Sequence, residues 1–156
     1  MKWFSRSVAV TGIIVARLGE KSYLLLTKRS ETMEEMPGRW CLPGGYLDWN
    51  ETLQDALERE VYEETGINLP EINENLVFNV PEVHISSNLE SIRQNIVMFS
   101  LRYYDFKDKL PEWSITSEVS NVEWVEMGID EISTRNLSFG QYEVLQKVGN
   151  QVNERF

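Results

Sequence analysis

The stretch Gly44–Ile67, GGYLDWNETLQDALEREVYEETGI, contains seven carboxylates, and four of them fall within residues 58–64. Its pattern predicts a helix over Thr52–Thr65, with Asn50 as a plausible N-terminal cap and Gly66 as a natural stop. On a helical wheel of about 100° per residue, one arc is apolar and must face the core. That arc consists of Leu53, Ala56, Leu57 and Val61.

The carboxylates of this helix do not all avoid the apolar arc. Glu60 and Glu64 fall on it and Glu63 lies at its edge, whereas Glu58 and Arg59 point outward. An inward-facing acidic cluster at a helix C-terminus is unfavourable through like-charge repulsion, burial and the helix dipole. A solvated face would instead carry its glutamates on the outer arc. Arg59 or another cation could offset the charge, but Mg²⁺ or Mn²⁺ explains the cluster better, because both prefer oxygen ligands.

The loop before this helix supports a ligand site. It contains Pro43, Gly44 and Gly45, and two adjacent glycines allow the backbone to approach a ligand closely. A Gly-Gly turn is weak evidence by itself. One short loop ahead of inward-facing carboxylates, it becomes much stronger.

The whole segment resembles the signature of the Nudix (MutT-like) hydrolases. Every fixed position of that signature is matched, by Gly45, Glu51, Arg59–Glu60–Val61, Glu63–Glu64 and Gly66–Ile67. The resemblance implies an α/β fold, an α/β/α sandwich around a mixed β-sheet. We expect one domain over residues 1–156, with the Nudix box at 45–67.

The same resemblance implies a reaction, the metal-dependent hydrolysis of a pyrophosphate. The substrate would be a nucleoside diphosphate linked to another moiety, such as ADP-ribose or a nucleotide sugar, or a nucleoside triphosphate. Glu60 and Glu64 would be the main metal ligands, Glu63 a further ligand or the base, and the Gly44 carbonyl a backbone ligand.

Other catalytic roles also follow from the resemblance. Arg59 would orient the glutamates of the box, and Glu51 would help to fix that network. Many members use a further acidic residue on a loop before a late strand, for which Glu118 is the candidate. An ordinary exposed loop glutamate is an equally good description of Glu118. Glu123 fits less well, since the strand pattern places it beside Trp124.

Substrate recognition must come from outside the box. Tyr46 and Trp49 lie beside the predicted metal loop and could stack on a nucleobase, and Arg39 could hold a phosphate. Core packing or solvated surface explains each of them singly as well. Further candidates are Trp3, Phe4, Tyr103 and Trp113 for stacking, and Arg6, Arg29 and Arg93 for phosphate.

Composition limits the partners. The chain has 156 residues, 25 acidic against 15 basic, and a net charge of -10, which disfavours nucleic acid. A bound metal would still allow a phosphorylated small molecule.

No run approaches the ~20 apolar residues of a membrane span. The single cysteine, Cys41, excludes an intrachain disulfide and is expected to be buried, and His84 is expected in a strand or loop. We therefore expect a cytoplasmic protein, and a homodimer is an option because many family members are dimers.

Two other functions remain open at this stage. A module that senses a nucleotide sugar without cleaving it is one, although such proteins usually lose box glutamates that are all present here. A hydrolase acting on RNA 5′ ends is the other, and the acidic balance counts against it.

The rest of the chain reads as alternating strands and helices. Residues 41–47 are expected to be an irregular connection, and 129–136 a helical turn. Strands are predicted at 7–18, 22–29, 75–85, 93–106 and 118–127, with a hairpin joining the first two and a final amphipathic helix over 138–152.

Overall fold

The computed structural model describes residues 7–87 and 95–156 of the chain. Its first two strands, β1 (Val8–Leu18) and β2 (Lys21–Arg29), are rich in apolar residues and pair antiparallel. At the turn between them, Gly19 has a φ of 65°, a left-handed value that glycine adopts without strain. The predicted hairpin is therefore confirmed.

The later strands complete a seven-stranded mixed sheet. β6 (Ile96–Phe106) runs parallel to β1 along its whole length, and β5 (Leu76–Ser87) pairs antiparallel with β6 at the edge. β7 (Val119–Glu126) pairs antiparallel with β2. The main strand order is β3-β2-β1-β6-β5, with β4 on β1 and β7 on β2. The three late strands are those that the sequence predicts.

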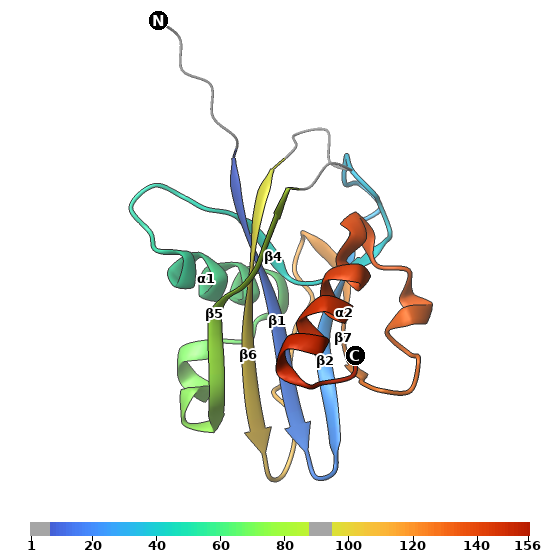
Figure 1. The fold of residues 1–156 in the computed structure, drawn as a ribbon. Helices are drawn as coiled ribbons and strands as arrows, with labels where there is room; N and C mark the ends of the chain where they lie inside the picture. Colours follow the sequence, from blue (N-terminus) through green and yellow to red (C-terminus); the bar gives the residue numbers. More distant parts are fainter. Residues whose placement is uncertain (1–6, 88–94) are drawn as a thin grey trace, which may run out of the picture.

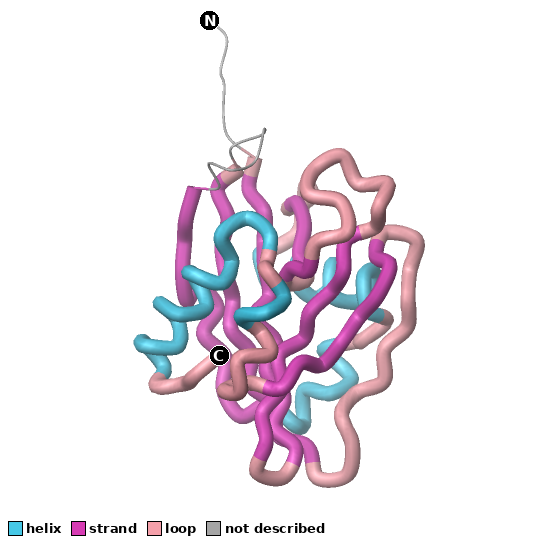
Figure 2. Tube along the Cα trace, turned by 90° about the vertical axis from the view of Figure 1, so that its right-hand side faces the viewer, coloured by secondary structure: helices cyan, strands magenta, loops and turns pink. Residues whose placement is uncertain are grey.

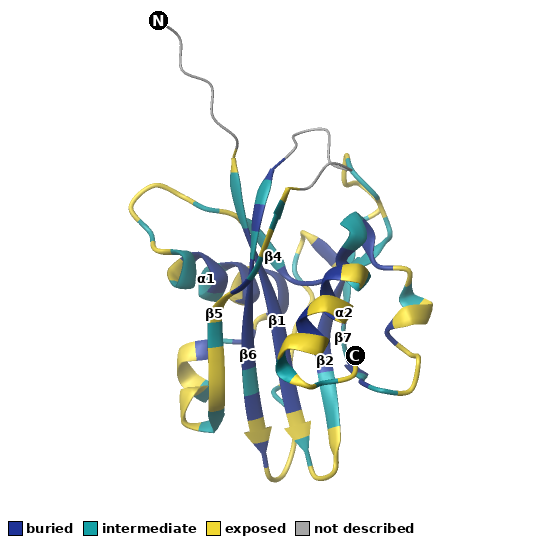
Figure 3. Ribbon diagram, in the orientation of Figure 1, coloured by how far each residue is buried: buried dark blue, intermediate teal, exposed yellow. Residues whose placement is uncertain are grey.

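Helices α1 (Leu53–Thr65) and α2 (Gln141–Val152) lie on opposite faces of this sheet, as Figures 1 and 2 show. Successive side chains of a strand point to opposite faces. Ile14 accordingly belongs to the hydrophobic cluster beneath α1, whereas its neighbours Ile13 and Val15 belong to the cluster beneath α2. Figure 3 shows burial concentrated along the central strands and the inner sides of the helices. The predicted α/β/α sandwich around a mixed sheet is confirmed.

One edge of β1 is divided between two partners. Its first part, Ala9–Thr11, pairs with β4 (Gly44–Tyr46), and Gly12 donates its N–H to the carbonyl of Pro43 at 2.8 Å. Its last part, from Val15, pairs with β2. Beyond Leu24, β2 no longer pairs with β1. Its residues Thr27 and Lys28 pair instead with β3, the segment Trp40–Cys41. Residues 41–47 are thus largely short strand rather than irregular, because the divided sheet offers them backbone partners.

The start of α1 differs from the prediction. Thr52, and not Asn50, is the cap: its hydroxyl accepts from the N–H of Asp55 at 3.1 Å, and the Asp55 carboxylate accepts from the N–H of Thr52 at 3.2 Å. This reciprocal pair is a capping box. At the other end Gly66 has a φ of 74° and donates its N–H to Tyr62, so the predicted stop is confirmed.

Glu58 also departs from the expected position. It does not simply face solvent, because its carboxylate accepts a hydrogen bond from the buried Arg102 of β6 at 3.0 Å. Arg102 donates to Gln54 of α1 as well, at 2.8 Å. The outer edge of α1 is thereby attached to the sheet by a polar contact that no local sequence pattern reveals.

Short 3₁₀ helices complete the described parts of the chain. Residues 138–152 do not form one helix. Phe139 and Gly140, in the 3₁₀ turn before α2, both have positive φ, so the α-helix begins only at Gln141. No helix in the ranges that the structure describes is both long and apolar enough to cross a membrane. The 3₁₀ helices are η1 (Leu69–Asn75), η2 (Ser133–Arg135) and η3 (Ser138–Gly140).

Candidate active site

Helix α1 directs its last carboxylates toward the protein. Glu60 and Glu64 are 9% and 7% exposed, as the wheel predicts, and Glu63 is exposed at the rim. Leu57 and Val61 are fully buried on the same face of the helix, so packing of that face forces the two glutamates inward. The inward position of both glutamates therefore follows from the hydrophobic pattern of α1.

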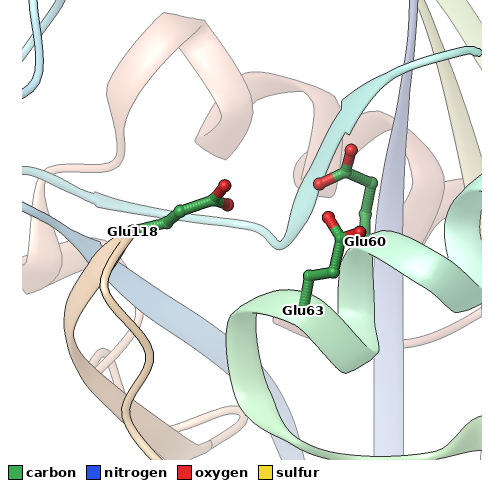
Figure 4. A group of neighbouring side chains, drawn as sticks. All are labelled: Glu60, Glu63 and Glu118. Atoms are coloured by element: carbon green, nitrogen blue, oxygen red, sulfur yellow. The ribbon is translucent and has the colours of Figure 1, made fainter.

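Three carboxylates from two distant segments come together here. One oxygen from each of Glu60, Glu63 and Glu118 lies within 4.8 Å of the others. Figure 4 shows Glu118 on the loop before β7, reaching across toward the two helix residues. Glu123, the other acidic residue considered in this region, instead binds Arg135, with a 3.0 Å hydrogen bond from Nη2. The structure thus places Glu118, and not Glu123, beside the box glutamates.

Glu64 lies beside this group and has its own backbone contact. Its Oε1 accepts a hydrogen bond from the N–H of Gly44 at 2.9 Å. Burial raises the pKa of Glu64 to about 8, and the charges of Glu60 and Glu118 act in the same direction. Burial likewise raises the pKa of Glu60, against the opposing effect of its hydrogen bond with Arg59. An added positive charge would favour the ionised form of both.

The two glycines are required for different reasons. A Cβ on Gly44 would lie 2.2 Å from the carbonyl oxygen of Val10, so a side chain would push β4 away from β1. A Cβ on Gly45 would lie 2.4 Å from the carboxylate of Glu60. Both glycines thus bring backbone close to its neighbour, in one case a strand and in the other a carboxylate.

Arg59 connects the loop to the helix. Its guanidinium donates to both oxygens of Glu51, at 2.7 and 3.1 Å, and to Glu60 at 2.7 Å. It also donates to Glu63 at 3.3 Å and to the carbonyl of Tyr46 at 2.9 Å. These contacts raise the pKa of Arg59, and Arg59 in turn lowers the pKa of Glu51. One cation thereby fixes the direction of several box carboxylates.

The carboxylates lie at one end of a cavity of about 740 Å³. Glu60, Glu64 and Glu118 line it, together with residues that the sequence does not connect with the box. His84, expected to be an ordinary strand residue, lies in β5 and packs edge-on against Phe99 at 5.9 Å. Those lining residues include His84, Phe99, Phe139, Gln141, Val144 and Lys147. These positions carry no local signal, because only the folded sheet brings them opposite α1.

The predicted substrate residues occupy different surroundings. Tyr46 lines the cavity, and its hydroxyl accepts a hydrogen bond from Asn95 at 3.0 Å. Trp49 is 95% exposed on the loop before α1, and Arg39 donates to the carbonyls of Asn136 and Leu137. In the described ranges the cavity is lined by neither Trp49 nor Arg39.

The remaining candidates are similarly divided. Arg29 lines the cavity, whereas Tyr103 stacks on Phe78 at 5.1 Å and Trp113 is 39% exposed. Cys41 is buried, as expected, and contacts Thr27. Four candidates, Trp3, Phe4, Arg6 and Arg93, lie outside the residues that the structure describes.

The family model of the NUDIX domain matches residues 6–148, which is most of the chain. The chain belongs to the Nudix hydrolase family. The box and the sandwich fold are therefore parts of one known architecture, as the sequence resemblance implies.

Several curated relatives match part of the chain. The m7GpppN-mRNA hydrolase NUDT17 of Danio rerio is 43% identical over 65 residues, 42% of this chain and 21% of that protein. The ADP-ribose pyrophosphatase of Methanocaldococcus jannaschii is 36% identical over 77 residues, 49% of this chain and 41% of that protein. The matches thus span less than half the length of either relative.

A solved Nudix structure matches nearly the whole chain. It is the bifunctional NMN adenylyltransferase/ADP ribose pyrophosphatase of Francisella tularensis, complexed with AMP and a manganese ion. The match has a TM-score of 0.74 at 20% identity and covers 97% of this chain and 43% of that one. At this identity the likeness establishes the shared fold.

Nudix hydrolases generally use divalent metals, and the residues present here fit such an ion. The oxygen-only donor set suits a hard cation such as Mg²⁺ or Mn²⁺. A diphosphate entering this cavity would meet Glu60, Glu64 and Glu118, which repel it. A cation held among these carboxylates removes that conflict.

Proposed function

We propose that the chain hydrolyses the diphosphate of a nucleoside diphosphate linked to another moiety, such as ADP-ribose or a nucleotide sugar, or of a nucleoside triphosphate. The observation that carries this proposal is the meeting of Glu60, Glu63 and Glu118 beside a cavity of about 740 Å³, which Glu60 and Glu118 line. A cavity of this size accommodates a small organic ligand. The complete Nudix box supports turnover over a purely sensing role.

Mg²⁺ or Mn²⁺ would be held by Glu60, Glu64 and Glu118, together with the carbonyl of Gly44. When bound, the ion supplies Lewis-acid stabilisation of the phosphate oxygens and lowers the pKa of a water molecule. Glu63 is exposed at the rim of the same cluster, and we assign it as a further ligand or as the base that takes the water's proton.

The supporting residues keep this arrangement fixed. Arg59 binds Glu51, Glu60 and Glu63 together, so none of these carboxylates swings freely. The N–H of Gly44 holds Glu64 in the cavity wall. Tyr46 is the predicted substrate residue that lines the cavity. Trp49 and Arg39 stay candidates for a larger substrate that extends beyond the cavity.

Hydrolysis of capped RNA is a second candidate function, and the NUDT17 relatives favour it. Those proteins are named m7GpppN-mRNA hydrolases, and the one of Danio rerio is 43% identical over 65 residues. The net charge of -10 opposes it, because RNA binding depends on a basic surface. We therefore place it behind the small-molecule substrate.

A panel of substrates tests both functions. ADP-ribose, nucleotide sugars, dinucleoside polyphosphates, nucleoside triphosphates and a short capped RNA would each be incubated with Mg²⁺, and the products separated by chromatography. We expect a nucleoside monophosphate from one of the small molecules. If the capped RNA is the only substrate that is cleaved, and its cap nucleotide is released, the second function is established instead. Tight nucleotide binding without any cleavage would establish a sensing module.

We also propose a cytoplasmic location and a homodimer. The single cysteine gives no requirement for an oxidising compartment, and many members of the family are dimers. Light scattering after size-exclusion chromatography measures the mass directly. A mass of one chain would reject the dimer.

A further inference from the structure

Phe139 has a backbone conformation that bulky residues rarely adopt. Its φ is 55° and its ψ is 30°, in the left-handed region, within the turn that precedes α2. The Cβ of an L-residue is crowded there, so such a conformation in a phenylalanine requires support from its surroundings. Gly140, the next residue, also has a positive φ but bears no such cost.

Core packing does not account for the position of Phe139. The ring belongs to neither of the hydrophobic clusters that flank the described sheet, and the residue is only partly buried. Instead it lines the cavity that contains Glu60 and Glu64. An aromatic ring held in this way at the wall of a ligand cavity is better explained by a contact that the ligand completes.

Arg29 holds the ring from one side. The guanidinium carbon of Arg29 lies 5.1 Å from the ring centroid of Phe139, a cation–π geometry. The Nε of Arg29 donates to the carbonyl of Glu35 at 3.0 Å, which fixes the side chain. A ring has two faces, and the guanidinium covers one. Both Arg29 and Phe139 line the cavity, so a ligand there is within reach of the ring.

We propose that Phe139 is the platform on which the aromatic base of the substrate stacks, with Arg29 as the residue that positions its ring. This rests on the function proposed above and deepens it, because it ties recognition to a base and not only to a diphosphate. Base stacking on an aromatic side chain tolerates every base, since each has a π face. The inference therefore predicts a requirement for a base without naming which one.

ADP and inorganic pyrophosphate test this inference, because both contain a diphosphate but only ADP carries a nucleoside. Binding of ADP and of inorganic pyrophosphate would be measured by calorimetry with Ca²⁺ as the metal, in the wild type and in Phe139→Ala, Phe139→Gly and Phe139→Tyr. We expect Phe139→Ala and Phe139→Gly to weaken ADP about tenfold or more, the ordinary scale of one lost base–aromatic contact. Pyrophosphate binding should change less than about twofold, and Phe139→Tyr should retain ADP binding.

A stability measurement separates recognition from folding. Phe139→Gly relieves the left-handed strain, so its thermal midpoint should not fall even though ADP binding does. Phe78→Ala, which removes a partly exposed ring that stacks on Tyr103, is the matched control and should leave ADP binding unchanged. Equal weakening of both ligands, or unchanged ADP binding in Phe139→Ala, would overturn the proposal.

The outcomes also separate this inference from the proposed function. A wild type that cleaves no substrate of the panel rejects the proposed function, whatever the Phe139 variants do. A wild type that cleaves a nucleotide, combined with the same KM in Phe139→Ala, rejects the platform alone. A KM raised with kcat nearly unchanged supports both.

Discussion

At the scale of single residues, Arg59 organises the carboxylates. It is the partner of Glu51, Glu60 and Glu63 and of the Tyr46 carbonyl, so four acceptors depend on one guanidinium. A flat, forked cation can bind several acceptors in a fixed geometry, and an ammonium group cannot. The charge of this residue also partly offsets the burial of Glu60.

Arg59→Lys tests that role. The positive charge remains, but lysine cannot reproduce the paired hydrogen bonds to Glu51, so the carboxylates lose their common orientation. We expect activity or metal affinity to fall by about 10- to 100-fold, the usual effect of losing a residue that orients metal ligands. Steady-state kinetics over a range of Mg²⁺ concentrations measures it. Activity within about twofold of the wild type would show that charge alone suffices.

Glu64→Gln tests the most deeply placed carboxylate. The substitution keeps the shape of the side chain and removes the charge of a proposed metal ligand that is 7% exposed. We expect a loss larger than the roughly 10- to 100-fold typical of residues around the ligands. Circular dichroism should show an unchanged fold. Glu20→Gln, at the exposed β1–β2 turn, is the control with the same chemistry and should keep full activity. Near-normal turnover in Glu64→Gln would reject Glu64 as a ligand.

At the scale of elements, the divided edge of β1 decides where the site forms. β4 occupies the part of that edge that β2 leaves, and it brings Gly44 and Gly45 against the sheet directly before α1. The loop and the helix are thus held by one strand, since α1 packs on the same β1 through Leu57 and Val61. Because the loop and the helix are both held by β1, the positions of the carboxylates relative to the loop are fixed.

Alanine at each of the two glycines should therefore have a different effect. In Gly44→Ala the new Cβ meets backbone, the carbonyl of Val10, which cannot move aside without breaking strand pairing. We expect a clear fall in the thermal midpoint. In Gly45→Ala it meets the end of the Glu60 side chain, which can move without disturbing the backbone but only by giving up its hydrogen bond with Arg59. There we expect near-normal stability with reduced activity. Thermal unfolding and kinetics on both variants decide, and the reverse pattern would contradict this assignment.

Much of the fold could be predicted from the sequence because its signals are local. Branched apolar runs marked the long strands, and the spacing of Leu57, Glu60 and Glu64 marked one face of α1. The errors arose where distant chain supplied the partner. Within residues 41–47, Cys41 and Gly44–Tyr46 are strand because β1 and β2 part and leave them backbone partners. Phe139 gave no signal, since its place in the cavity depends on how the turn before α2 meets the far side of the sheet.

At the scale of the whole molecule, the pKa of Glu64 couples the site to folding. Burial raises that pKa from 4.5 to about 8, so the folded metal-free protein holds this proton more tightly than the unfolded chain does. Between these two values the folded state binds more protons, and the free energy of unfolding therefore falls as pH rises. The shift of Glu60 has the same direction. The lowered pKa of Glu51 acts in the opposite sense, with its stabilisation lost as pH falls below 4.5.

The thermal midpoint of the metal-free protein should accordingly fall between about pH 5 and pH 8. Mg²⁺ should raise it more at pH 8 than at pH 5.5, because binding requires the ionised carboxylates and releases their protons. Calorimetric unfolding with and without Mg²⁺ at each pH gives both quantities. Glu64→Gln should weaken the pH dependence. A wild-type midpoint that stays level over this range would contradict the coupling.

The parallel pairing of β1 with β6 sets an order of events during synthesis. Val8 lies opposite Ile96 and Leu18 opposite Phe106, so β1 waits for a strand that is made almost ninety residues later. Pairing across such a separation is slow to form, and the unpaired edge of the strand exposes apolar side chains and backbone N–H and C=O groups meanwhile. Glu118 is translated later still. A nascent chain therefore completes its box helix early, yet it brings its acidic groups together only after Glu118 has been made.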